Sequence, residues 1–224
     1  MIKNVFLDVD DTLLDFKAGQ KEAFFQACAE LGYKVNEEIY ELYDGINIFY
    51  WEKFERGEIA KHALLTARFD MLFEKTGING DSRDMENAYR KYLKDKAIWI
   101  DGAEDGLKYL ANKYNVYVLT NGESVTQKNR VKISGIENYV KDIFVSEAVG
   151  YPKPQKEYYD YCFLKSGAKA AETIAIGDSL TSDILGGKNA GTKTLWFNFR
   201  GLSPNEKVKP DYEVRTWKEI KEIL

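Results

Sequence analysis

Five short apolar runs, rich in β-branched and aromatic residues, constrain the fold of this 224-residue chain more than any other feature. Each has the length of a buried strand and is bounded by polar residues. They are Val5–Leu7, Val116–Leu119, Ile143–Val145, Ile174–Ile176 and Leu195–Phe197. The segments between the last four runs are long enough for one helix each. This alternation predicts a parallel sheet covered by helices on both faces, and therefore an α/β fold.

The interval between the first and second runs, about a hundred residues, is far longer than one crossover connection. Apolar residues recur in it at helical spacing in four groups, which are separated by glycine-containing breaks. We therefore expect a core domain formed by residues 1–15 and 97–224, with a helical domain inserted over residues 16–96. The aromatic residues Phe49–Trp51 and Phe54 in the insert fit a helical core face better than a base-stacking surface.

The composition argues against several classes of protein. Lys and Arg total 32 against 36 Asp and Glu, a formal net charge of -4, so the basic face of a polynucleotide-binding protein is not expected. The longest segment without a charged residue, Tyr114–Gly122, is much shorter than the ~18 apolar residues of a membrane-spanning helix. The N-terminus lacks the pattern of a secretion signal. We expect a cytoplasmic protein that binds neither polynucleotide nor membrane, as a monomer or a homodimer.

Cysteine and histidine are too scarce for the common zinc sites. The chain has only Cys28, Cys162 and His62, and the two cysteines are far apart in the sequence. Neither a disulfide framework nor a thiolate–imidazole centre can be built from these residues. Any bound metal ion is therefore expected to have oxygen ligands.

Polar residues follow the strand-like runs at the points where a parallel sheet places its ligand site. The residues after four of the runs are Asp8–Thr12, Thr120–Gly122, Lys153 between two prolines, and Asp178 with Asp183. Each group alone is compatible with an ordinary acidic turn, a helix cap or a surface charge. Their joint occurrence after successive strands is what indicates a functional site.

Three of these carboxylates predict a bound cation. Asp8 and Asp10 are separated by one residue, so both can face one site as the chain leaves the strand. A third carboxylate, Asp178, would make the cluster strongly repulsive unless a cation neutralised it. Oxygen ligands with open positions suit Mg²⁺, which also bridges to phosphate. Together with Lys153, the predicted Mg²⁺ site points to a phosphorylated substrate.

These motifs resemble those of the haloacid dehalogenase (HAD) superfamily of aspartyl-phosphate phosphotransferases. The matching segments are Asp8–Leu13, Thr120, Lys153 and Gly177–Asp183, for the first to fourth motifs in order. The resemblance covers nearly the whole chain and implies a Rossmann-like (HAD) core with an α-helical cap domain inserted after the first motif. Within the superfamily the chain looks most like the YjjG/YfnB-type nucleotidases, which dephosphorylate nucleoside 5′-monophosphates, chiefly pyrimidine ones. The segments that carry this closer likeness are Asp8–Phe16, Ser146–Gly150 and Ser182–Gly191.

The resemblance implies a Mg²⁺-dependent phosphatase with an assigned set of residues. Asp8 is the expected nucleophile and Asp10 the acid and base. The expected metal ligands are the carboxylates of Asp8 and Asp178 and the main-chain carbonyl of Asp10. Asp183 is not an expected ligand but is expected to support the waters of the metal or Lys153. The expected phosphate-binding residues are Thr120, Asn121 and Lys153. Substrate choice is expected to lie in the cap.

Three alternatives stay open from the sequence. Phosphatases for sugar phosphates or phosphoglycolate share all four motifs, and so do sugar phosphomutases with a similar cap. Dehalogenases proper lack an acid two residues after the nucleophile, so Asp10 favours a phosphate ester. A non-catalytic phosphoacceptor signalling module also combines acids, Thr and Lys on a parallel sheet, but such modules are shorter and lack the helical insert.

Overall fold

The computed structural model describes residues 1–204 and 207–224, which form two compact units. The larger unit joins Met1–Phe16 to Ala97–Leu224, and the smaller unit is Lys17–Lys96. The chain therefore leaves the larger unit soon after its first strand and returns to it before the second. The smaller unit is an insertion in the larger one.

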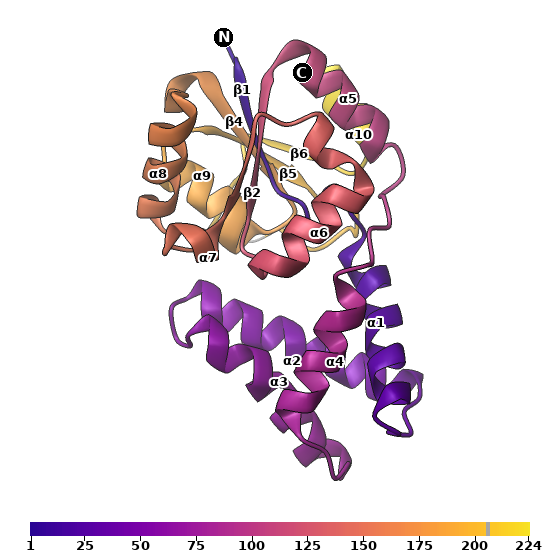
Figure 1. Cartoon of the computed structure of the whole chain (residues 1–224). Helices are drawn as coiled ribbons and strands as arrows, with labels where there is room; N and C mark the ends of the chain where they lie inside the picture. Colours follow the sequence, from indigo (N-terminus) through magenta and orange to yellow (C-terminus); the bar gives the residue numbers. More distant parts are fainter. Residues whose placement is uncertain (205–206) are drawn as a thin grey trace. The chain divides into compact units, whose positions relative to one another are not determined.

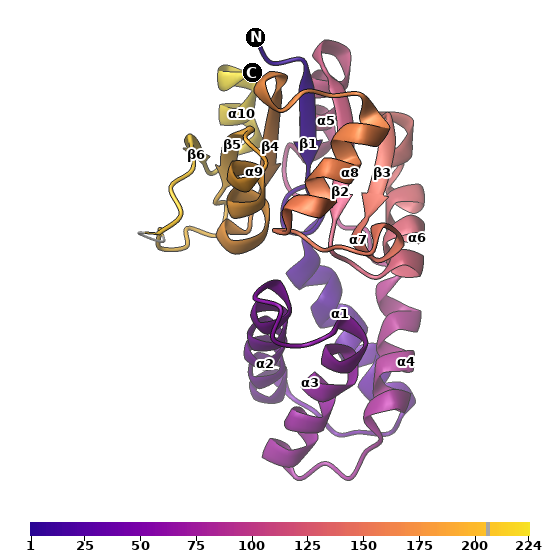
Figure 2. The same ribbon diagram turned by 90° about the vertical axis from the view of Figure 1, so that its left-hand side faces the viewer.

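A parallel sheet forms the centre of the larger unit (Figures 1 and 2). Its strand order is β3-β2-β1-β4-β5-β6, and every neighbouring pair is parallel. The strands are β1 (Asn4–Leu7), β2 (Asn115–Thr120), β3 (Asp142–Val145), β4 (Thr173–Gly177), β5 (Lys193–Phe197) and β6 (Tyr212–Val214). The five apolar runs are strands, and the predicted α/β fold is confirmed. The short β6 has no apolar run, because its first two residues are exposed.

Side-chain alternation along the strands divides the core of the larger unit into two layers. Val5 and Leu7 of β1 pack in one layer with residues of α5 (Ala103–Lys113), α6 (Ser124–Ser134) and α10 (Trp217–Ile223). Phe6, between them, packs on the opposite face with residues of α8 (Lys156–Ser166). The remaining helical segments of this unit are η1 (Ile136–Asn138), α7 (Ser146–Val149), η2 (Ala170–Glu172), η3 (Leu180–Ile184) and α9 (Leu185–Asn189). The sheet is thus covered on both faces.

The smaller unit consists of helices in the part of the chain from 17 to 96. They are α1 (Phe16–Glu30), which begins in the larger unit, α2 (Glu37–Glu55), α3 (Lys61–Thr76) and α4 (Ser82–Leu93). Stacked aromatic rings form the core: Tyr43 lies 4.6 Å from Phe24 and 5.1 Å from Phe69, centroid to centroid. The four predicted helices are confirmed.

The aromatic stretch of α2 only partly follows the expected core assignment. Phe54 is buried, but Phe49 is 40% exposed. The helical-core interpretation is therefore wrong for Phe49, which stands on the outer side of α2 with Lys53 over its ring. Among residues 1–204 and 207–224, no helix combines the length and the apolar character that crossing a bilayer requires.

The packing of α10 on α5 makes a testable prediction about stability. A methyl group on Gly106 of α5 would stand 2.0 Å from Cε3 of Trp217. Gly106→Ala is therefore expected to lower the free energy of unfolding by about 1–3 kcal/mol, because the indole has to move. Urea denaturation measures the change. Gly45→Ala in α2 is the matched control, since its added methyl group meets no atom within 4 Å; equal effects of the two substitutions would contradict the packing.

Candidate active site

The carboxyl ends of β1, β2 and β4 present three polar residues at one edge of the sheet. The register pairs Leu7 of β1 with Ile176 of β4, and the amide of Asp8 donates a hydrogen bond to the carbonyl of Ile176 at 2.9 Å. Asp8 therefore leaves its strand level with the end of β4, where Asp178 follows. Thr120 is the last residue of β2, the neighbour of β1 on the other side. The parallel topology thus brings residues distant in sequence to one edge.

Lys153 is the buried cation of this edge. Its ammonium group donates three hydrogen bonds: to Asp8 Oδ1 at 2.6 Å, to Asp183 Oδ1 at 2.6 Å and to the carbonyl of Leu119 at 2.9 Å. All three N–H groups are therefore used. Burial by itself lowers the pKa of Lys153, but Asp183 and Asp8 outweigh it and hold the pKa well above its usual value. The lysine stays charged between two carboxylates.

Three carboxylates meet around this lysine. One oxygen atom from each of Asp8, Asp178 and Asp183 lies within 4.8 Å of the others. Burial, opposed by Lys153 and reinforced by Asp183, raises the pKa of Asp8 to about 8. Burial and the charges of Asp11 and Asp8 raise the pKa of Asp178 well above its usual value. One ammonium does not balance three carboxylates, so the residues fit a divalent cation with oxygen ligands.

Asp183 is held in the cluster by the turn that follows β4. Its Oδ2 accepts a hydrogen bond from the amide of Ser179 at 3.1 Å, while its Oδ1 receives Lys153. A Cβ atom on Gly177, the last residue of β4, would lie 2.2 Å from the carboxylate of Asp183. Only glycine leaves room for the carboxylate to approach the strand this closely. The glycine at the end of β4 therefore serves the packing of Asp183.

Asn121 ties the loop that carries Lys153 to the end of β2. Its Oδ1 accepts a hydrogen bond from the amide of Lys153 at 2.9 Å, and its Nδ2 donates to the carbonyl of the same residue at 3.0 Å. Nδ2 also lies 3.4 Å from Oγ of Ser182. The side-chain amide thus mimics a backbone pairing with Lys153 and sets the position of the lysine.

Asp10 lies outside the carboxylate cluster and has partners of its own. Its Oδ2 accepts a hydrogen bond from Nε2 of Gln127 at 2.7 Å, and its Oδ1 forms an ion pair with Arg130. Nε2 of Gln127 also donates to the hydroxyl of Thr120 at 2.7 Å. Both carboxylate oxygens of Asp10 are therefore oriented by residues of α6.

The turn after Asp10 is held in place by the loop that follows β5, at the same edge of the sheet. Asp11 has a positive φ of 54°, and its Oδ1 caps the first amide of α1, that of Phe16, at 2.9 Å. Arg200, from the loop after β5, donates to Oδ1 of Asp11 and of Asp15, at 2.8 Å each. The turn that carries the strand-end carboxylates is therefore anchored by an arginine.

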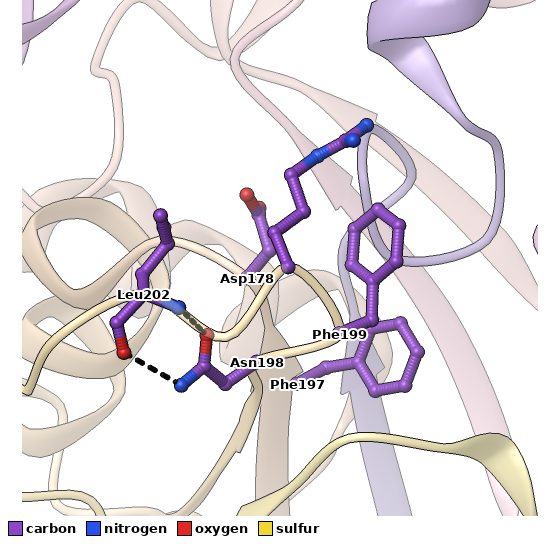
Figure 3. Close-up of a pocket in the computed structure, with 6 residues that line it drawn as sticks. Asp178, Phe197, Asn198, Phe199 and Leu202 are labelled. Atoms are coloured by element: carbon purple, nitrogen blue, oxygen red, sulfur yellow. Dashed lines mark hydrogen bonds between the residues drawn. The ribbon is translucent and has the colours of Figure 1, made fainter.

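The loop after β5 also lines a small pocket beside Asp178. Figure 3 shows Asn198 joined to Leu202 by two hydrogen bonds, which close the loop: Nδ2 donates to the Leu202 carbonyl at 2.9 Å, and the Leu202 amide donates to Oδ1 at 2.7 Å. The pocket is lined by Asp178, Phe197, Asn198, Phe199, Arg200 and Leu202. Of the carboxylate cluster, Asp178 thus lines a small hollow that it shares with two phenylalanine side chains.

Comparison with known proteins decides which family this geometry represents. The family model described as haloacid dehalogenase-like hydrolase matches residues 5–197, which include every site residue described above except those of the loop after β5. The chain is a haloacid dehalogenase-like hydrolase. Family membership makes the chain a hydrolase and decides against the phosphoacceptor signalling module. Because its relatives include named phosphatases and nucleotidases, the chain is an enzyme that hydrolyses phosphate esters.

Relatives of this HAD-like hydrolase match over almost their full length. The HAD-hydrolase YfnB of Bacillus subtilis is 38% identical, over 99% of this chain and 95% of that protein. A crystal structure of YfnB bound to magnesium has a TM-score of 0.95 at 36% identity, covering 100% of this chain and 98% of that one. The pyrimidine 5′-nucleotidase PynA of Streptococcus pneumoniae is 33% identical, over 99% of this chain and 94% of that protein. The pyrimidine 5′-nucleotidase YjjG of Escherichia coli is 28% identical, over 98% of this chain and 96% of that protein. The resemblance to this branch of the superfamily is confirmed.

The structure sorts the predicted site residues of the HAD-like hydrolase into two connected groups. Asp8, Lys153, Asp178 and Asp183 form the carboxylate cluster, with Asn121 behind the lysine. Asp10 and Thr120 form a second group, joined through Gln127.

Sequence reasoning missed Gln127 and Arg130. A signal for them exists: they are polar residues spaced i, i+3 on the helix that directly follows the Thr–Asn–Gly motif. That spacing places both on one helix face, but nothing local shows that the face is buried.

The unbalanced carboxylates predict a stabilising substitution. Folding raises the pKa of Asp178, so ionisation of this residue in the folded state costs stability as pH rises above about 4. In the presence of a chelator, Asp178→Asn is expected to raise the melting temperature by a few degrees at about pH 8, equivalent to ~1 kcal/mol, and by less at about pH 4.5. Thermal unfolding followed by circular dichroism measures the shift. Asp101→Asn, at an exposed position, is the control; a lower melting temperature for Asp178→Asn at about pH 8 would contradict the electrostatic argument.

Proposed function

We propose that this HAD-like hydrolase is a Mg²⁺-dependent phosphatase that hydrolyses nucleoside 5′-monophosphates, pyrimidine nucleotides above all, through an aspartyl-phosphate on Asp8. The observation that carries the chemistry is the buried Asp8 carboxylate, with Oδ1 on Lys153 and a second carboxylate, Asp10, two residues later. The choice of nucleotides is supported by the relatives PynA and YjjG, which are both pyrimidine 5′-nucleotidases.

In the first half-reaction Asp8 attacks the phosphorus of the ester. A bond forms between a carboxylate oxygen of Asp8 and phosphorus, and the bond from phosphorus to the ester oxygen breaks. Asp10 donates a proton to the departing oxygen, so the nucleoside leaves as a neutral alcohol. Lys153 holds the other carboxylate oxygen of Asp8 and keeps the nucleophile oriented.

In the second half-reaction water releases the phosphoryl group. Asp10, now a carboxylate, accepts a proton from the water as its oxygen bonds to phosphorus, and the bond to Asp8 breaks. The products are inorganic phosphate and the regenerated Asp8 carboxylate, with the proton back on Asp10. A single residue thus serves as acid and then as base, a contribution of about 10²–10⁴-fold in typical enzymes.

The residues that would hold Mg²⁺ are Asp8, Asp178 and the main-chain carbonyl of Asp10, with Asp183 in reach. When bound, the cation would supply positive charge that offsets the repulsion between an anionic nucleophile and an anionic substrate. The approach of carboxylate oxygens to within 4.8 Å of one another supports this assignment, as does the magnesium-bound structure of YfnB. Thr120 would bind the phosphoryl oxygens directly. The direct phosphate contacts expected of Lys153 and Asn121 are not part of this proposal, because Lys153 directs three N–H groups to Asp8, Asp183 and the Leu119 carbonyl, and the Asn121 amide pairs with the backbone of Lys153. These two residues would instead set the position of Asp8.

The substrate class is tested by a panel of phosphate esters assayed with Mg²⁺. We expect pyrimidine nucleoside 5′-monophosphates to have a kcat/KM at least about tenfold above those of sugar phosphates and phosphoglycolate, equivalent to ~1.4 kcal/mol in transition-state binding. Phosphate release measured continuously gives the values.

Controls separate the chemistry from the substrate preference. Asp8→Asn should lose turnover of every ester while retaining the circular dichroism spectrum of the wild type. Preference for a sugar phosphate would overturn the nucleotidase assignment but leave the phosphatase in place. Full activity of Asp8→Asn would overturn the nucleophile.

A further inference from the structure

Gln127 and Arg130 are buried polar residues that reach the proposed acid–base residue from α6. Both side chains are 1% exposed. Gln127 contacts Oδ2 of Asp10 at 2.7 Å, and Arg130 pairs with Oδ1. The two residues also contact each other, because Nη1 of Arg130 donates to Oε1 of Gln127 at 2.8 Å. This pair of side chains, here called the α6 clamp, binds both carboxylate oxygens of Asp10.

The hydrogen bonds of Gln127 allow only one orientation of its amide. Nε2 has two N–H groups, and they go to Asp10 Oδ2 and to the hydroxyl of Thr120. Oε1 accepts from Arg130, which has only donors. A flipped amide would set a carbonyl oxygen against a carboxylate and an N–H₂ group against a guanidinium. Gln127 is therefore a fixed bridge between Asp10 and Thr120.

The same bridge determines what the hydroxyl of Thr120 can do. Its oxygen accepts hydrogen bonds from Nε2 of Gln127 at 2.7 Å and from the amide of Gly122 at 3.0 Å. A hydroxyl has two acceptor positions and one donor, so both acceptor positions are filled. The proton of Thr120 remains as the donor, which is what binding an anionic phosphoryl oxygen requires. The clamp thus sets the polarity of Thr120 as well as the position of Asp10.

The surrounding structure is shaped to hold the clamp. A Cβ atom on Gly122 would lie 2.4 Å from Cγ of Gln127, so the glycine after the strand leaves room for the glutamine. The guanidinium of Arg130 lies over the ring of Phe16, 5.5 Å from its centroid. Burying an arginine is costly unless it is paired, and the carboxylate that pairs with it here is Asp10.

We propose that Gln127 and Arg130 are positioning residues for the phosphatase reaction. They hold Asp10 for proton transfer and orient the Thr120 hydroxyl so that it donates a hydrogen bond to the phosphoryl group. This proposal rests on the proposed function. It assigns the two residues different effects: Arg130 acts on Asp10, whereas Gln127 acts on both Asp10 and Thr120.

Leaving-group dependence tests the effect on Asp10. The leaving group of p-nitrophenyl phosphate, p-nitrophenolate, departs without being protonated, whereas the alkoxide leaving group of an alkyl phosphate needs a proton. We expect Arg130→Met to lower kcat/KM for both esters, and the decrease for the best alkyl ester of the panel to be at least about tenfold larger than that for p-nitrophenyl phosphate. This difference is a fraction of the full contribution of general acid–base catalysis. A partly unfolded variant loses both activities by the same factor, so the ratio cancels simple structural damage.

Inhibition by inorganic phosphate tests the effect on Thr120. Gln127→Met is expected to change the leaving-group ratio as Arg130→Met does, and also to raise the inhibition constant of phosphate about tenfold, which corresponds to one lost charge-assisted hydrogen bond. Arg130→Met should leave that constant near the wild-type value. Arg215→Met, the same change at an exposed position of the larger unit, is the control and should alter neither quantity.

The outcomes separate the two proposals. If the wild type turns over neither ester, the proposed function fails and the clamp with it. If the wild type is active but both substitutions leave the leaving-group ratio unchanged, only the clamp is overturned. A ratio that shifts in favour of the alkyl ester would mean that the clamp restrains Asp10, which also contradicts the proposal.

Discussion

A single buried ammonium group holds the carboxylate edge of this protein together. Lys153 donates all three N–H groups to partners inside the site, two carboxylates and one carbonyl. Without it, Asp8 and Asp183 would be uncompensated buried charges, which costs several kcal/mol each in typical proteins. With it, the cluster still carries more negative than positive charge, because Asp178 adds a third carboxylate. The same imbalance that opposes folding is what makes the edge receptive to a divalent cation.

Close approaches of backbone and side chain make this edge possible. Gly177 leaves space for the carboxylate of Asp183, and Gly122 leaves space for Gln127. Gly177 ends β4 and Gly122 lies two residues after the end of β2, where the chain turns away from the sheet. The acidic cluster and the clamp on Asp10 therefore share one structural feature. In each, a glycine near the end of a strand leaves space for a buried polar side chain. Substitution at either glycine would displace a buried polar residue of the candidate site rather than simply weaken the core.

Much of the fold could be predicted from the sequence, because its strands are short apolar runs and its inserted helices have a clear spacing of apolar residues. Asp8, Lys153 and Asp178 could be singled out because the carboxyl ends of parallel strands share one edge. The polar pair of α6 could not, because polar residues that share one face of a helix usually face solvent. Only the contact of Gln127 with Asp10, 117 residues earlier, shows that this face is buried.

The lysine, the cluster and Asp10 support one chemical account, in which the phosphoryl group is transferred twice: first to Asp8 and then to water. The stereochemistry at phosphorus tests this account most directly. With an ester whose phosphorus is chiral through oxygen isotopes, two in-line displacements invert the configuration twice. The account therefore predicts net retention of configuration in the released phosphoryl group when an alcohol acceptor replaces water. Net inversion would show a single direct displacement and would contradict a covalent intermediate on Asp8.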